Sequence, residues 1–88
     1  MRIKKGFVHR TLCGEHVVVG EGLEQVNFNK LLSLNNSAAY LWDSVVDRDF
    51  TEDMLTELLL DKYDVTAEVA AADAHKLVET FRQQGIIE

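Results

Sequence analysis

The chain has 88 residues, of which 47% are hydrophobic, so it is long enough for one domain with a small core. A core of this size leaves little room for a deep catalytic cleft, and the composition therefore predicts a protein that is not an enzyme. Fifteen acidic and nine basic side chains give a net charge of −6, which repels nucleic acid and anionic lipid. Because there is no proline, low-complexity tract or repeat, we expect residues 1–88 to form a single domain.

The acidic residues are concentrated in the second part of the chain. Residues 1–35 carry five basic and three acidic side chains, whereas residues 36–88 carry four basic and twelve acidic ones. The single cysteine, Cys13, excludes an intrachain disulfide. The sequence also has no hydrophobic leader and no apolar run of about 18 residues. We therefore expect a cytoplasmic protein that does not contact a membrane.

Residues 7–12 and 16–19 have the pattern of a β-hairpin whose loop is Cys13-Gly14. A loop of two residues places Val8 opposite Val19 across the hairpin. We expect this register to bury one face of the hairpin, formed by Val8, Leu12, Val17 and Val19. Residues 26–34 then alternate imperfectly, with Phe28, Leu32 and Leu34 on one face, and this pattern predicts a third strand.

After the third strand, apolar residues follow the spacing of a helix, which Asn35, Asn36 or Ser37 is placed to cap. Its predicted apolar face consists of Ala38, Leu41, Trp42 and Val45. A second helix is expected from Thr51 to Asp64, with Met54, Leu55, Leu58, Leu59 and Tyr63 on its apolar face. A third helix is expected from Thr66 to Gly85, with Ala70, Ala74, Leu77, Val78 and Phe81 on its apolar face.

Ile86 and Ile87 follow the last predicted helix and are expected to fold back onto the core. The order of the elements predicts an α+β fold, in which a three-stranded antiparallel sheet is followed by a three-helix bundle. Proteins of this kind include the winged-helix modules.

His9 and His16 are the first side chains to consider for chemistry. The predicted register places both on the outward face of the hairpin, diagonal to each other and roughly 7 Å apart. Two imidazoles bind a metal loosely, but a zinc site needs three or four protein ligands, and no carboxylate is placed to complete one. We interpret the pair as solvated sheet histidines and predict no metal site and no cofactor.

Cys13 and the acidic residues of the first two helices do not indicate catalysis either. A nucleophilic cysteine needs a base and an oxyanion site, which a hairpin turn in so small a domain does not offer. The acidic residues do not have the spacing of a calcium loop and fall mostly on solvated helix faces. No catalytic residue is predicted.

The third helix carries five alanines between Ala67 and Ala74. High helix propensity explains them locally. The functional alternative is that small side chains let another backbone approach and leave a shallow groove beside the helix. The groove would then have a mixed apolar and polar wall, formed by Val69, Asp73, Lys76 and Thr80.

One edge of the third strand is expected to be unpaired, and it could form the other side of the same groove. In a sheet of three successive strands the second strand lies in the middle, so one edge of the third strand keeps unpaired N–H and C=O groups. Such an edge beside a helix can accept an extended peptide as an added strand. A solvated edge with no ligand is the alternative.

Several segments together resemble the PqqD-like family, named for coenzyme PQQ synthesis protein D. The segments are Leu34-Asn35 at the end of a strand, SAAYLW at 37–42, Phe50-Thr51 before a Leu-rich helix that ends in Tyr63, and Gly85-Ile86-Ile87 at the end of the last helix. The resemblance covers roughly residues 6–88 and depends on the order and spacing of these segments together.

The resemblance implies a winged-helix-like RiPP recognition element, a non-catalytic module that acts as a peptide chaperone. Such a module captures the leader of a ribosomally made precursor peptide and presents it to an enzyme that modifies it, usually a radical S-adenosylmethionine enzyme. The leader would add as a strand to the third strand and lie against the third helix. The corresponding residues here are Lys30, Leu31, Leu32, Ser33, Leu34, Val69, Asp73, Lys76, Leu77 and Thr80.

Two other classes remain open. A winged-helix regulator would bind DNA, but the third helix has only Lys76 and Arg82 against Glu68, Asp73 and Glu79, and a recognition helix should be basic. A homodimer through the free strand edge would need no peptide ligand.

Overall fold

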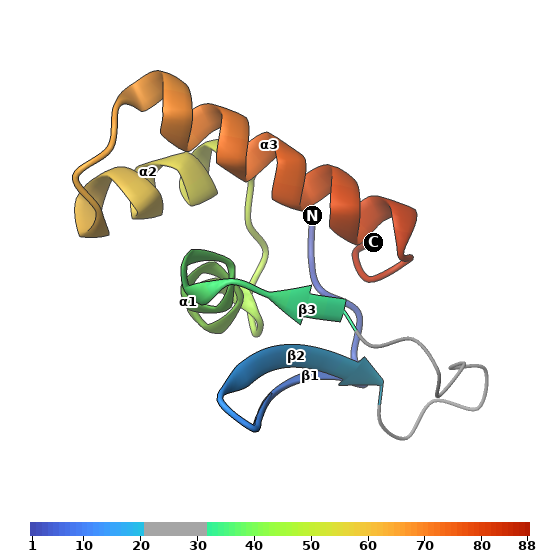
Figure 1. The fold of residues 1–88 in the computed structure, drawn as a ribbon. Helices are drawn as coiled ribbons and strands as arrows, with labels where there is room; N and C mark the ends of the chain where they lie inside the picture. Colours follow the sequence, from blue (N-terminus) through green and yellow to red (C-terminus); the bar gives the residue numbers. More distant parts are fainter. Residues whose placement is uncertain (21–31) are drawn as a thin grey trace.

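The computed structural model describes residues 1–20 and 32–88, which form a three-stranded sheet followed by three helices, as predicted. The elements are β1 (Phe7–Leu12), β2 (Glu15–Gly20), β3 (Leu32–Leu34), α1 (Asn36–Val45), α2 (Glu52–Lys62) and α3 (Ala67–Gln83). Figure 1 shows α2 and α3 side by side as one layer, with the sheet and α1 on the other side of the core. The α+β fold class predicted from the sequence is confirmed.

The hairpin has the predicted loop and the predicted register. Val8 pairs with Val19 and Arg10 with Val17 across β1 and β2. The loop residues Cys13 and Gly14 have φ values of 52° and 80°. A type I′ turn requires positive φ at both central residues, and its twist matches the twist of the two strands that it joins.

The prediction of the buried hairpin face is wrong. Leu12 is 49% exposed, whereas Val18, on the opposite face, is only 2% exposed and belongs to the core. Val17 is also only 6% exposed, but it lies outside the core cluster, on the face that points away from the helices. The run Val17, Val18, Val19 supplies apolar side chains to both faces, so alternation could not identify the inner one.

β3 is the edge strand of the sheet, because the strand order is β1-β2-β3. It pairs antiparallel with β2, with Leu34 opposite His16 and Leu32 opposite Val18. Leu34 is buried and Leu32 partly buried, while Ser33 is exposed, as their alternation predicts. Residues 26–31 of the predicted strand lie outside the described residues.

Each helix begins at a polar cap. The side chains of Asn35, Thr51 and Thr66 accept hydrogen bonds from the backbone N–H groups three residues further on, at 2.8, 3.2 and 3.2 Å. Such bonds satisfy donors that the first turn of a helix leaves free. Helix α2 ends at Lys62, earlier than the predicted Asp64, because Tyr63 adopts an extended conformation.

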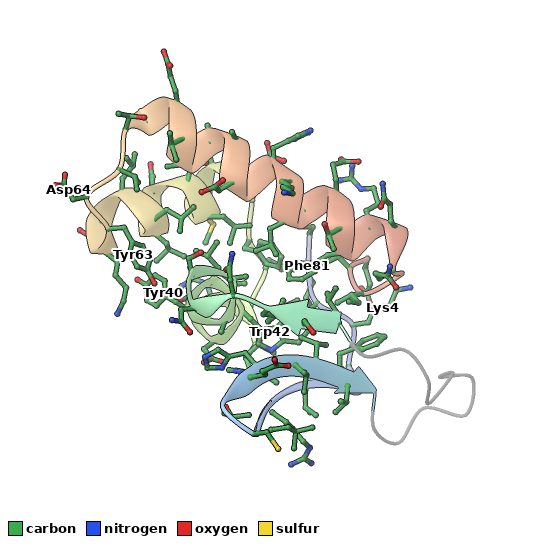
Figure 2. All side chains as sticks on the ribbon, in the orientation of Figure 1. Lys4, Tyr40, Trp42, Tyr63, Asp64 and Phe81 are labelled. Atoms are coloured by element: carbon green, nitrogen blue, oxygen red, sulfur yellow. The ribbon has the colours of Figure 1, made fainter. Side chains whose placement is uncertain are left out.

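The core lies between the sheet, α1 and the α2–α3 pair. Trp42 of α1 packs edge to face on Phe81 of α3, with ring centroids 5.4 Å apart. The two side chains lie between the helices in Figure 2. All predicted apolar residues of α1 are buried, and the predicted face of α3 is buried except for Leu77, which is partly buried.

The two ends of the chain are joined beside α3. Gly85 has a φ of 70° and reverses the chain after α3, and Ile87 then pairs with Ile3 in an antiparallel bridge. Ile86 and Ile87 are buried, so the prediction that they fold back onto the core is confirmed. In the described part of the chain, no helix is long and apolar enough to cross a membrane.

Candidate functional site

A cavity of about 220 Å³ lies between β3 and α3. One wall is formed by Leu32, Ser33 and Leu34, which are the whole of β3. The opposite wall belongs to α3 and consists of Asp73, Lys76, Leu77 and Thr80. The structure therefore brings together, around one cavity, residues that are about forty positions apart in the sequence.

Two of the residues predicted for this site are not described by the structure, and a third does not line the cavity. Lys30 and Leu31 fall outside the described residues. Val69 does not line the cavity, although it belongs to α3 and is 47% exposed. It lies one turn before Asp73, towards the N-terminal end of the helix.

The floor of the cavity comes from residues that the sequence analysis assigned only to capping or to the core. They are Asn35, Ser37, Ala38, Leu41 and Leu59. Leu41 and Leu59 are almost fully buried, and Asn35 is the cap of α1. The apolar spacing of the two leucines identified them as core. Only the packing of α1 and α2 beneath the groove shows that they also form its floor.

Asp73 and Lys76 are opposite charges on the cavity wall, three residues apart on α3. Both side chains are exposed. Neither has a hydrogen-bond or ion-pair partner for its charged group among residues 1–20 and 32–88. The cavity thus has Leu41 and Leu59 in its floor, and it carries at its rim one charge of each sign that is unpaired among the described residues.

A second cavity, of about 420 Å³, adjoins the first at the end of β3 that leads into α1. The two cavities share Asn35, Ser37, Leu59 and Asp73. The second is bounded in addition by Asn36, Tyr63 and Val65. The Tyr63 ring packs edge to face on Tyr40, with centroids 6.2 Å apart, and both rings are visible beside α2 in Figure 2. Together the cavities make a continuous groove, which we call the β3–α3 groove.

The profile of the family described as coenzyme PQQ synthesis protein D (PqqD) matches residues 15–87. The chain belongs to the PqqD family. The match begins in β2 and includes every described residue of the β3–α3 groove. No curated protein matches the sequence.

Two solved structures share the fold of this PqqD-family chain. One is TbiB1 in complex with the TbiA(beta) leader peptide, with a TM-score of 0.75 and 12% sequence identity, covering 100% of this chain and 95% of that one. The other is lasso peptide synthetase B1 complexed with the leader peptide, with a TM-score of 0.73 and 17% identity, covering 99% and 95%. At these identities the likeness shows the fold.

The alanines of α3 do not form the groove in this PqqD-family member. Ala70 and Ala74 have no exposed surface, and they lie in the core where α3 packs beside α2. Ala67, Ala71 and Ala72 are exposed, and none of the five lines either cavity. The two buried alanines therefore serve the packing of the core, and the alternative that the alanines leave the groove open does not hold.

The prediction that His9 and His16 face outward is also wrong. Both rings point towards α1, where His9 Nδ1 lies 2.9 Å from Asp43 Oδ1 and His16 Nε2 lies 3.1 Å from Asn36 Oδ1. They lie on the inner face because Val18, on the same face, belongs to the core. Their polar atoms are satisfied there by α1, which the strand pattern alone could not reveal.

Within the part of the chain that the structure describes, no group of three or more His, Cys, Asp or Glu side chains is placed to hold a metal ion. Cys13 is exposed in the hairpin turn. The β3–α3 groove combines a cavity with an edge strand and with two charged side chains that are unpaired among the described residues.

Proposed function

We propose that this PqqD-family protein binds the leader segment of a ribosomally made precursor peptide in the β3–α3 groove. The observation that carries the proposal is the cavity between the edge strand β3 and the free charges of α3. Similarity to two folds that were solved with leader peptides supports it. The proposed contact residues are the described members of the predicted set, with Lys30 and Leu31 remaining predictions.

The leader would bind as a fourth strand on the open edge of β3. Antiparallel pairing continues the pattern of the sheet and is slightly more stable per residue than parallel pairing. Backbone hydrogen bonds to β3 would supply sequence-independent affinity, and alternate side chains would enter the groove. Their apolar contacts would be with Leu34, Leu41 and Leu77, which line it.

The bound peptide would be presented to an enzyme that modifies it, and a radical S-adenosylmethionine enzyme is the partner that the family suggests. Tethering raises the concentration of the peptide near the active site of the partner, so the module needs no reacting group of its own. Any iron–sulfur cluster would belong to that partner. The absence of catalysis, a cytoplasmic location and a single domain over residues 1–88 stay predictions within this proposal.

Amide NMR titration tests the proposal directly. The probes are synthetic peptides that correspond to the short open reading frames beside the gene, added to the ¹⁵N-labelled full chain. We expect shifts at Leu32, Ser33 and Leu34 and along the 73–80 segment of α3. Shifts confined to the outer face of the hairpin, or no shifts with any of these peptides, would contradict it.

A homodimer through β3 is the second candidate, because the same open edge can pair with its copy. In that case the edge would be occupied without any peptide. Sedimentation velocity of the peptide-free chain over a range of concentrations separates the two. A dimer whose formation peptide does not reverse would favour this alternative.

A further inference from the structure

We infer that the β3–α3 groove selects peptides by the order of two charges, with a basic residue preceding an acidic residue two positions later. The inference rests on the proposed function and adds a specificity rule to it. It follows from the direction of the bound strand and from the positions of Asp73 and Lys76.

The direction of the groove is fixed by the two elements that line it. Figure 1 shows β3 and α3 running in opposite directions, β3 towards α1 and α3 away from the α2–α3 turn. A peptide that pairs antiparallel with β3 therefore runs in the same direction as α3. Its earlier residues lie near the end of β3 at Asn35, and its later residues lie near Leu32.

The two free charges lie in the same order along this path. Asp73 lines both cavities and shares the second with Asn35 and Asn36, at the end of the groove where the peptide would begin. Lys76 lines only the first cavity, together with Thr80, further along the peptide. A basic peptide side chain is thus expected first, beside Asp73, and an acidic one afterwards, beside Lys76.

The spacing of the charges fits two residues of a strand. Three helical residues advance about 4.5 Å along the axis, and two strand residues advance about 6.6 Å, a difference that flexible long side chains absorb. Residues two apart also point to the same face of a strand, so both can face the groove. The residue between them would point away from it.

The second cavity suits the aliphatic part of a basic side chain. Its wall includes the Tyr63 ring and Val65, which is 38% exposed, next to the Asp73 carboxylate. Lysine and arginine bury their methylene stems on such surfaces while the charged end stays hydrated.

Selection from a display library of random ten-residue peptides tests the rule on the full-length chain. We expect the enriched peptides to carry Lys or Arg two positions before Asp or Glu. The double variant Asp73→Lys, Lys76→Asp should enrich the reverse order. Both side chains are exposed, so the exchange should preserve the fold, and circular dichroism verifies this.

The matched control exchanges another pair of charges at the same spacing on the same helix. Glu79 and Arg82 form an ion pair of 3.0 Å and line neither cavity. The double variant Glu79→Arg, Arg82→Glu should enrich the same charge order as the unmodified chain. If this variant also reverses the order, general electrostatics and not the groove selects the peptide, and the rule is overturned.

Affinities of two synthetic peptides give the quantitative test. The peptides differ only in the order of the two charges, and fluorescence anisotropy is measured at low salt. Each exposed ion pair changes affinity by about two- to fivefold, and the preference should shrink at high salt. The neutralised variant Asp73→Asn, Lys76→Gln should bind both peptides equally. A preference that survives this neutralisation would overturn the rule.

The outcomes separate the specificity rule from the proposed function. Peptides that shift the amides of β3 but show no charge order would overturn the rule and leave strand addition intact. A library that yields no peptide binding at β3 would overturn both.

Discussion

His9 and His16 share a contact of 2.9 Å between His9 Nε2 and His16 Nδ1, at the centre of a chain of hydrogen bonds that begins and ends on α1. Asp43 binds the other nitrogen of His9, and Asn36 binds the other nitrogen of His16. The chain of contacts connects both strands of the hairpin to the first and the third turns of α1. It therefore fixes the helix that follows β3 relative to the sheet.

Replacing His16 should destabilise the protein. His16→Ala removes two hydrogen bonds and leaves Nε2 of His9 without a partner, although the His9 side chain is only 13% exposed. We expect the free energy of unfolding, measured by urea denaturation, to fall by about 1–2 kcal/mol. His75→Ala is the control, because the His75 side chain is 64% exposed and makes one bond, to Glu52. That variant should change the free energy of unfolding by less than about 0.5 kcal/mol. Equal losses in the two variants would contradict a stabilising role of the contacts between His9 and His16.

Enlarging a buried alanine should show that the alanines of α3 serve packing. Ala74 has no exposed surface, so Ala74→Leu inserts three carbon atoms into a filled core. We expect a loss of about 1–3 kcal/mol in the free energy of unfolding. Ala71→Leu, on the exposed side of the same helix, should leave stability nearly unchanged. Thermal unfolding measures the stability of both variants. If Ala74→Leu is as stable as the unmodified protein, the core around Ala74 is not filled.

The chain reversal after α3 should require glycine at position 85 because of its backbone conformation, and not because a side chain there would clash. Its φ is 70°, and a Cβ added there would meet no atom within 4 Å. Gly85→Ala should therefore cost only the strain of the left-handed conformation, about 1–2 kcal/mol of unfolding free energy. Gly85→Asn should lose less, since asparagine tolerates this region better. Urea denaturation measures the unfolding free energy of both variants. Equal losses for alanine and asparagine would show that the left-handed conformation of residue 85 is not the cause.

The hairpin turn offers a stabilising substitution. Cys13 has a φ of 52° at the first of two turn positions, and Gly14 occupies the second. Asn-Gly is strongly preferred in turns with positive φ at both positions, so Cys13→Asn should raise the free energy of unfolding by about 0.5 kcal/mol. Cys13→Val should lower it, because a β-branched side chain is strained there. Differential scanning calorimetry measures both, and a stabilised valine variant would be the contrary result.

Filling the β3–α3 groove should weaken peptide binding without unfolding the protein. Thr80 lines the cavity, and among the described residues its hydroxyl donates to the Lys76 carbonyl of its own helix. Thr80→Trp should weaken the binding of any peptide identified by NMR by about tenfold or more. Ala72→Trp places the same ring on the exposed side of α3 and should have no effect on affinity. Undiminished binding to Thr80→Trp would place the peptide elsewhere.

The sequence by itself determined the elements, their order and most of their ends. The polar caps Asn35 and Thr66 and the reversal at Gly85 depend on local backbone chemistry, which acts over a few residues and can be read from the chain. The helix faces were also predictable, because spacing places Trp42 and Phe81 on apolar stripes. The same local information indicated that β3 would be an edge strand.

Tertiary packing decided which face of the hairpin is inside and what forms the groove. Val17 and Val18 have the same chemistry, and only the position of α1 over the sheet buries Val18 in the core and brings His9 to Asp43. In the same way, Leu59 and Asp73 line one cavity only because α2 and α3 pack side by side. Contacts between residues distant in the sequence depend on how the elements fit together, and periodicity within one element carries no information about that fit.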